Sequence, residues 1–247
     1  MKNKPKPEHK LRINKYLSLC GVASRRKSDL IVEQGRVSVN GKIINEPGIL
    51  IEPIKDVVMV DGELVELEDK VYYKLYKPPG YISTVKDDKN RKTVMEFFND
   101  IPYSVFPVGR LDMESEGLLI FTNDGDLANR LTHPKYKIEK IYETGINKQL
   151  DKSALEKIKN GIKLDEGVTS KCQVEVLYSG KNGMELLIIL KQGWKRQIRR
   201  MVEHVGAKVT YLKRTFVGPI GLHGLNPGNK RKLNAKELKA LKKSLGL

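Results

Sequence analysis

The chain of 247 residues contains few of the side chains that build metal centres, disulfide frameworks or membrane spans. Its two cysteines, Cys20 and Cys172, are far apart and outside any CxxC spacing, and its four histidines are scattered. These patterns argue against a zinc site and against a disulfide framework. No apolar run approaches the ~18 residues needed to cross a bilayer. We therefore expect a protein of a reducing, cytoplasmic compartment, with no metal site and no membrane partner.

Acidic residues are also in short supply, because 46 Lys and Arg stand against 30 Asp and Glu, which gives a net charge of +16. Such an excess of positive charge favours a polyanionic partner. Nucleic acid is favoured over a membrane surface, since no long basic amphipathic helix is evident. Charge alone does not separate DNA from RNA.

The charge reverses along the chain, which predicts a domain boundary. Residues 1–48 carry 11 basic and 4 acidic side chains, whereas residues 49–69 carry 1 basic and 7 acidic side chains. A reversal of this kind is typical of one unit ending with its last strands turned away from a polyanion. We expect a small RNA-binding domain over residues 10–68 and a catalytic domain over residues 69–247.

The first domain is predicted to contain two short helices and a hairpin. Leucines at helical spacing end at Gly21, Ser24 is a candidate N-cap for a second helix that closes at Gly35, and Asn40-Gly41 favours a type I′ turn. The stretch "RINKYLSLCGVASRRKSDLIVEQGRVSVNGK" resembles the alpha-L RNA-binding module of ribosomal protein S4 over residues 11–69. The basic residues expected to contact RNA phosphates here are Lys15, Arg25, Arg26, Lys27 and Arg36.

Residues 69–247 alternate between strand-like and helix-like stretches without a regular βαβ rhythm. This pattern predicts an α+β domain around a mixed, mostly antiparallel sheet. Within it, "GRLDMESEGLLIFTNDGD" at residues 109–126 gathers five carboxylates in a basic chain. The segment opens like the calcium-binding loop of an EF-hand, but the twelfth position counted from Asp112 is Asn123 instead of a bidentate glutamate. The segment therefore does not match a calcium site. A glycosidase with paired catalytic carboxylates would normally have aromatic side chains on which the sugar stacks. Aromatic residues make up only 6% of the chain, which argues against this class of hydrolase.

Most of these acids have ordinary structural interpretations. We expect Glu114 and Glu116 in a solvated turn, Asp124 in a tight turn, and Asp126 as the N-cap of the following helix. Asp112 differs, because it follows an apolar strand and lies two residues after Arg110, whose charge favours an ionised carboxylate. The residues alone leave open whether Asp112 is a nucleophile.

The order of motifs carries a resemblance over essentially the whole chain. The motifs "KPPGYIS", "FPVGRLDMESEGLLIFTNDGDLANRLTHP", "KIEKIYE" and "QGWKRQIRRMVEHVGAKVTYLKR" resemble the ribosomal-RNA pseudouridine synthases of the RsuA/RluB type. The stretches "DDKNRKTVMEFF", "NRLTHPKY" and "RQIRRMVEHVG" are most similar to the branch that acts on 23S rRNA. The resemblance implies a monomeric isomerase that converts uridine to pseudouridine in rRNA without a cofactor or metal. The alternatives are the 16S rRNA branch and a non-catalytic ribosome-assembly binder.

The same resemblance implies roles for individual residues. Asp112 is the expected nucleophile, with Arg110 and Arg199 as the cations that keep it ionised. Tyr142 is expected to stack on the target uracil, with Ile198 packed beside the base. Further RNA contacts are expected from Lys77, Lys195, Arg196 and Arg200.

The chain also departs from the family pattern at two places. Gln192, Trp194 and Lys195 stand where an "EGRNRQVRR"-like run has Glu, Arg and Asn, and these positions are expected to touch RNA. "DMESEG" replaces a commoner "D-x-[DN]-T-x-G", which puts the loop-shaping roles of Glu114 and Ser115 in question.

Overall fold

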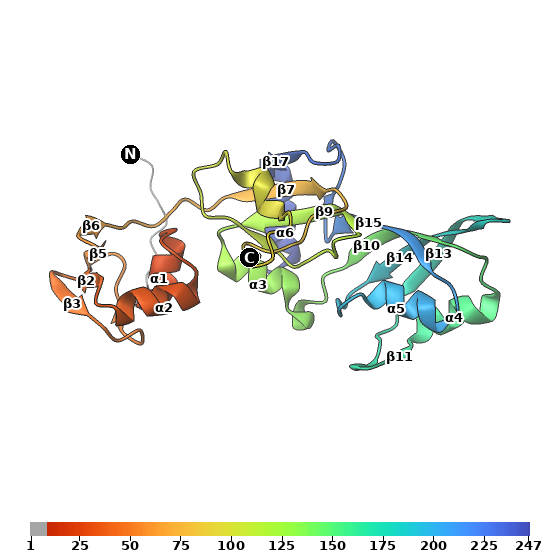
Figure 1. The fold of residues 1–247 in the computed structure, drawn as a ribbon, viewed down its shortest axis with the longest axis horizontal. Helices are drawn as coiled ribbons and strands as arrows, with labels where there is room; N and C mark the ends of the chain where they lie inside the picture. The colour runs from red at the N-terminus through yellow and green to blue at the C-terminus, as the bar shows by residue number, and fades with distance from the viewer. Residues whose placement is uncertain (1–8) are drawn as a thin grey trace. The chain divides into compact units, whose positions relative to one another are not determined.

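The computed structural model describes residues 9–247, which divide into two compact units (Figure 1). The first comprises the chain up to Val71 together with Pro102–Ser104, and the second comprises Tyr72–Ile101 and Val105–Leu247. None of the helices within residues 9–247 is long and apolar enough to cross a membrane.

The first unit packs two helices against a four-stranded antiparallel sheet of order β3-β2-β5-β6. Its core contains Ile13 and Leu17 from the first helix, Val32 from the second, and Val37 and Val58 from the sheet. The elements are β1 (Leu11–Arg12), α1 (Ile13–Leu19), α2 (Arg25–Glu33), β2 (Val37–Val39), β3 (Lys42–Ile44), β4 (Leu50–Ile51), β5 (Val58–Val60) and β6 (Glu63–Leu64).

The predicted turns of this unit are confirmed in their backbone geometry. Asn40 and Gly41 have φ of 52° and 79° between β2 and β3, the pair of positive angles that a type I′ hairpin requires. Ser24 is the N-cap of α2, although its side chain makes no capping hydrogen bond. Arg25, Arg26 and Lys27 are exposed in the first turn of α2.

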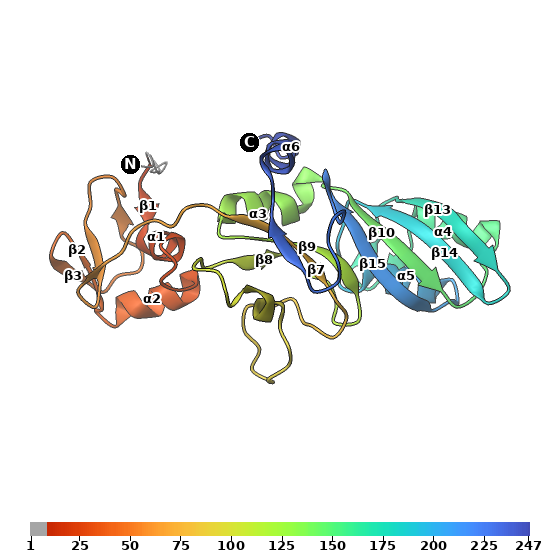
Figure 2. The ribbon, with the colours of Figure 1, turned by 90° about the horizontal axis from the view of Figure 1, so that it is seen from above.

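The second unit is built on a nine-stranded mixed sheet with the order β13-β14-β10-β15-β9-β7-β17 (Figure 2). β16 pairs with β15, and β8 pairs with β9. The elements are β7 (Tyr72–Lys77), η1 (Val94–Phe98), β8 (Phe106–Val108), β9 (Glu116–Thr122), α3 (Gly125–Thr132), η2 (Pro134–Tyr136), β10 (Lys140–Ile146), α4 (Lys152–Asn160), β11 (Lys163–Leu164), β12 (Gly167–Val168), β13 (Gln173–Gly180), β14 (Gly183–Leu190), α5 (Gln197–His204), β15 (Val209–Val217), β16 (Ile220–Gly221), β17 (Lys230–Lys232) and α6 (Ala235–Ser244).

Two hydrophobic clusters divide this sheet into halves. One cluster lies where α3 and α6 pack on β7, β8 and β9, and the other lies where α4 and α5 pack on β10, β13 and β14. The halves meet where β15 pairs with β9, the one parallel pairing of the described sheet, through Lys213–Glu116 and Arg214–Gly117. The expected α+β class with a mixed, mostly antiparallel sheet is therefore confirmed. The junction between the halves also places the segment that contains Asp112 beside the strand that pairs with Tyr142.

Candidate active site

Asp112 lies in a turn immediately before β9, and a buried lysine holds that turn in place. Lys77 is the last residue of β7 and its side chain is fully buried. Its ammonium donates to the carbonyl oxygens of Pro78 at 3.1 Å, Asp112 at 3.1 Å, Met113 at 3.3 Å and Ser115 at 2.6 Å. Burial lowers the pKa of Lys77 to about 8, although the nearby Asp112 carboxylate opposes the shift. Lys77 was predicted to contact RNA, but its burial corrects this, since the ammonium is turned inward onto the Asp112 loop.

A second set of hydrogen bonds fixes the residue before Asp112. The Ser83 hydroxyl donates to the Leu111 carbonyl at 2.9 Å and accepts from the Leu111 N–H at 3.1 Å, and both residues are buried. The two clamps fix the backbone on either side of Asp112, while its half-buried carboxylate accepts no hydrogen bond and forms no ion pair within residues 9–247. The Asp112 carboxylate therefore takes no part in the hydrogen bonds that hold its own loop in place.

Arg214 connects the Asp112 loop to the strand of Tyr142. It lies opposite Tyr142 in the pairing of β10 with β15 and opposite Gly117 in the pairing of β15 with β9. Its buried guanidinium donates to the Leu118 carbonyl at 2.8 Å and to the Arg110 carbonyl at 3.4 Å. Sequence reasoning missed Arg214, because the register that brings it between the two motifs is a property of the sheet.

Asp112, Arg110, Tyr142 and Ile198 line one cavity of about 420 Å³. The charged side chains around it comprise one carboxylate, that of Asp112, and six cations. Desolvation of a carboxylate is offset when cations surround it, and an anionic substrate is attracted by the same cations. The cations are Arg110, Lys140, Lys191, Lys195, Arg196 and Arg214.

Lys140 is a second cavity residue that sequence reasoning missed. Its ammonium donates to the Ile138 carbonyl at 3.0 Å, and burial together with the charge of Arg214 lowers its pKa to about 8. A lysine two residues before Tyr142 on a strand shares the face of that tyrosine. This spacing is a signal that could have identified it.

Arg199 and Arg196 face Glu114, a residue of the loop that carries Asp112. Glu114 was expected to be solvated, and it is 56% exposed, but its carboxylate lies 3.2 Å from Arg196 Nη1 and 3.6 Å from Arg199 Nη1. Arg199 also donates to the Ser115 hydroxyl at 3.3 Å. Arg199 thus contacts the loop that carries Asp112 and makes no ion pair with Asp112 itself in the described chain.

The other acids of the segment also have separate partners. Asp124 is the N-cap of α3, where it accepts from the Leu127 N–H at 3.2 Å, so the expectation that Asp126 is the cap is wrong. The Tyr72 hydroxyl donates to Asp124 at 2.9 Å. Glu116, expected to be solvated, accepts from the Tyr76 hydroxyl at 3.1 Å. These acids are therefore dispersed, and Asp112 is the one that faces the cavity.

Several of the predicted RNA-binding residues already have partners. Arg200 donates two hydrogen bonds to Glu166, at 2.7 and 2.9 Å, and Arg36 donates two to Asp61, at 2.9 and 2.5 Å. Lys195 is exposed at the rim of the cavity, and Lys15 is half-buried on α1.

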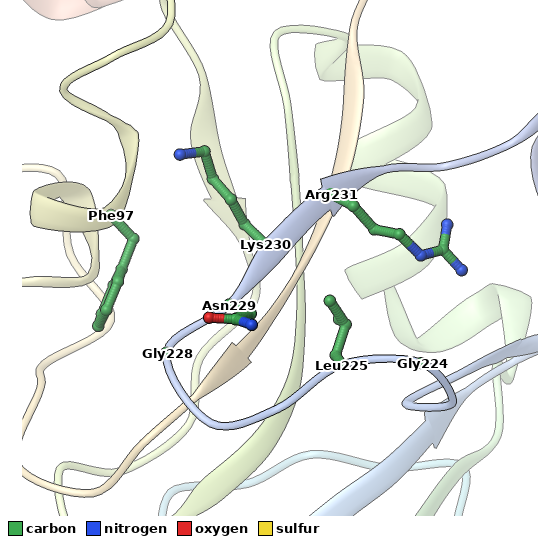
Figure 3. A pocket seen from close by; sticks show the side chains of 7 residues that line it. All are labelled: Phe97, Gly224, Leu225, Gly228, Asn229, Lys230 and Arg231. Carbon is green, nitrogen blue, oxygen red and sulfur yellow. The ribbon is translucent and has the colours of Figure 1, made fainter.

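A second cavity, of about 450 Å³, is lined by Phe97, Gly224, Leu225, Gly228, Asn229, Lys230 and Arg231 (Figure 3). Both of its cations are paired, Lys230 with Asp100 at 2.6 Å and Arg231 with Glu237 at 2.7 Å. In Figure 3 the Arg231 side chain points away from Phe97. Its volume is close to that of the first cavity. In the first cavity four cations form no ion pair within residues 9–247, namely Arg110, Lys140, Lys195 and Arg214, so the second cavity with its paired charges suits a polyanion less well.

Comparisons with known proteins identify the proteins that this chain is similar to. A family model described as RNA pseudouridylate synthase matches residues 71–204, and an S4 domain model matches residues 11–58. An uncharacterized RNA pseudouridine synthase of Aquifex aeolicus is 44% identical over 239 residues, which cover 96% of each chain. The ribosomal large subunit pseudouridine synthase B of Bacillus subtilis is 42% identical over 233 residues, 94% of this chain and 95% of the relative. A crystal structure of a pseudouridylate synthase is similar with a TM-score of 0.67 at 27% identity, covering 94% of this chain and 99% of the other.

Proposed function

Because this chain belongs to the RNA pseudouridylate synthase family, of the RsuA/RluB type, and carries an S4 RNA-binding domain, we propose that it isomerises specific uridines of 23S rRNA, with Asp112 as the nucleophile. The choice of 23S rRNA is supported by the similarity to the Bacillus subtilis large-subunit enzyme. We further propose that it acts in the cytoplasm as a monomer.

The observation that carries the assignment of Asp112 is the charge of the 420 Å³ cavity, which has six cations and a single carboxylate. The reaction breaks the bond between uracil N1 and ribose C1′, rotates the base, and joins C1′ to C5, after which C5 loses its proton and N1 carries one. Asp112 either adds to C1′ or removes the 2′ proton, and both routes need an ionised carboxylate at the sugar. The surrounding cations would also attract the phosphates of an RNA substrate to this carboxylate.

The target uridine has to leave its base stack to reach Asp112, so base flipping is part of the proposal. Tyr142 would then stack on the flipped uracil, and Ile198 would pack beside it, since both side chains line the cavity with Asp112. Lys195 and Arg196 at the rim would hold the displaced backbone through its phosphates. The exposed Arg25, Arg26 and Lys27 would contact the substrate from the S4 domain.

The test is to map pseudouridines in rRNA from a strain in which the gene is deleted, by carbodiimide treatment followed by primer extension. Each pseudouridine gives a stop in the primer extension. The proposal predicts that at least one such stop disappears from 23S rRNA in the deletion strain and returns on complementation. Loss of a stop from 16S rRNA instead would assign the chain to the small-subunit branch. If every stop persisted, the chain would be a non-catalytic ribosome-assembly binder.

A further inference from the structure

Trp194 is the only tryptophan of the chain, and it lines the cavity that also contains the proposed nucleophile. It is half-buried and lines the same cavity as Asp112, Tyr142 and Ile198. The flipped uridine and its stacking on Tyr142 do not use Trp194. Its ring must therefore either fill space or contact another part of the RNA.

Hydrogen bonds fix the backbone that carries Trp194. The side-chain oxygen of Gln197 accepts from the backbone N–H of Trp194 at 3.0 Å. The side-chain amide of Gln197 donates to Gln192 at 3.2 Å, and Gln192 also accepts from the Ser170 backbone N–H at 3.0 Å. Arg196 adopts a left-handed conformation with φ of 51° as the N-cap of α5. A residue with such a strained backbone persists only where the surrounding structure holds it in place, and such residues cluster at functional sites.

The hairpin of β11 and β12 lies near the outer edge of the ring. A Cβ on Gly167 would lie 3.8 Å from Cη2 of Trp194, so the outer edge of the indole lies near the hairpin, and the glycine leaves room for about one methyl group between them. The two hydrogen bonds from Arg200 to Glu166 tie the same hairpin to α5. The ring therefore lies between this hairpin and the cavity, on a backbone that hydrogen bonds hold in place.

The indole has the chemistry of a base-stacking platform. Its N–H has no hydrogen-bond partner within residues 9–247, so no polar contact accounts for its position. The neighbouring Lys195 lines the same cavity, is exposed, forms no ion pair within residues 9–247 and would hold a phosphate, whereas a flat ring offers a surface to a base. A preorganised aromatic side chain binds with little loss of conformational freedom, which increases affinity.

We propose that Trp194 stacks on the base of a nucleotide that adjoins the target uridine, and that it is a specificity-determining residue of this enzyme. The location next to the target rests on the proposed function. The stacking itself rests on the loop 191–196, the β11–β12 hairpin and the cavity wall.

Because Trp194 is the sole tryptophan, the fluorescence of the protein reports on it directly. The Asp112→Asn variant, which prevents turnover, is titrated with a short oligouridylate and with an abasic oligomer of the same length. The two probes have the same phosphates and differ in their bases. Stacking predicts that oligouridylate quenches the emission and that the abasic oligomer does not. Equal quenching by both probes would overturn the proposal.

Binding by variants provides the second readout. In the Asp112→Asn background, Trp194→Leu should weaken oligouridylate binding on the order of tenfold, the effect of losing one base–aromatic stack. Abasic oligomer binding should not change, and Trp194→Phe should recover part of the loss. A matched control, Tyr178→Leu, removes an aromatic side chain that is 61% exposed on β13 and should bind both probes like its parent. Unchanged oligouridylate binding by Trp194→Leu would contradict the stacking.

Activity on transcribed 23S rRNA fragments separates the two proposals. On a fragment that the wild-type protein modifies, Trp194→Leu should raise KM by a larger factor than it lowers kcat, whereas a merely space-filling tryptophan would lower kcat and stability together. If the wild-type protein modified no fragment while the base-dependent quenching persisted, the proposed function would fail and the stacking would stand. If the fragment were modified with the KM of Trp194→Leu unchanged, the role in specificity would fail alone.

Discussion

Replacing Lys77 with methionine would remove the ammonium that holds the Asp112 loop and keep an unbranched side chain in β7. Two of its four carbonyl partners retain another donor, because the Asp112 carbonyl also accepts from the Ser115 N–H and the Met113 carbonyl from the Gly80 N–H. The carbonyls of Pro78 and Ser115 depend on Lys77 among the described residues. Ser115 is buried, so its carbonyl would be left without a partner.

The free energy of unfolding should change little in Lys77→Met, because two terms oppose each other. A buried carbonyl without a donor costs about 1–3 kcal/mol. The fall of the Lys77 pKa from 10.5 to about 8 means that burial costs the ammonium roughly 3 kcal/mol at neutral pH, which the variant no longer incurs. We expect a net change within about 2 kcal/mol of zero.

The kcat of Lys77→Met should nevertheless fall by about 100-fold, because a displacement of about 1 Å at a reacting group has that effect. Lys74→Met is the matched control, since Lys74 is also buried on β7 but donates to the Gly221 carbonyl at 2.7 Å and pairs with Glu237 at 3.1 Å. It should lose stability and keep its kcat. Urea unfolding and single-turnover assays on rRNA measure the two quantities. A Lys77→Met enzyme with the wild-type kcat would refute the anchoring role.

Two further predictions follow from the same region. Gly117 has φ of 108°, and a Cβ there would overlap the Arg214 backbone, so Gly117→Ala should lower the unfolding free energy by about 3 kcal/mol or more. Gly125→Ala, at an uncrowded position in the first turn of α3, should leave the urea midpoint unchanged or raised. The Lys140 ammonium is charged below its pKa of about 8 and neutral above it, so RNA affinity should fall by up to about fivefold as the pH rises from 7 to 9. In filter binding, Lys140→Met should bind RNA more weakly and should lack this fall in affinity between pH 7 and 9. An unaltered fall in Lys140→Met would contradict its assignment to Lys140.

The local features that depend on short stretches of sequence were predictable. Asn40-Gly41 forms the expected hairpin turn. The fold class and the family were predictable as well, because the motifs occur in a specific order over the whole chain. The cavity location of Asp112 is consistent with the role predicted from its motif, and that role stays a prediction.

The features that depend on tertiary contacts were not predictable. A lysine in a strand is normally exposed, so nothing in the sequence indicated that four carbonyls, three of them from residues 112–115, surround Lys77. Arg214 acquires its position from the register of β15 against both β10 and β9. The N-cap assignment failed at Asp126 because either aspartate of "NDGD" could cap a helix, and only the start of α3 at Gly125 selects Asp124.

The most direct test of the central claim compares the wild-type protein with Asp112→Asn on unmodified 23S rRNA. Pseudouridine is mapped by carbodiimide treatment and primer extension, and RNA affinity is measured in parallel. We expect the wild-type protein to create a stop at a defined uridine, and Asp112→Asn to bind the RNA with similar affinity and create none. Pseudouridine formation by Asp112→Asn at the wild-type rate would contradict the assignment of Asp112 as the nucleophile.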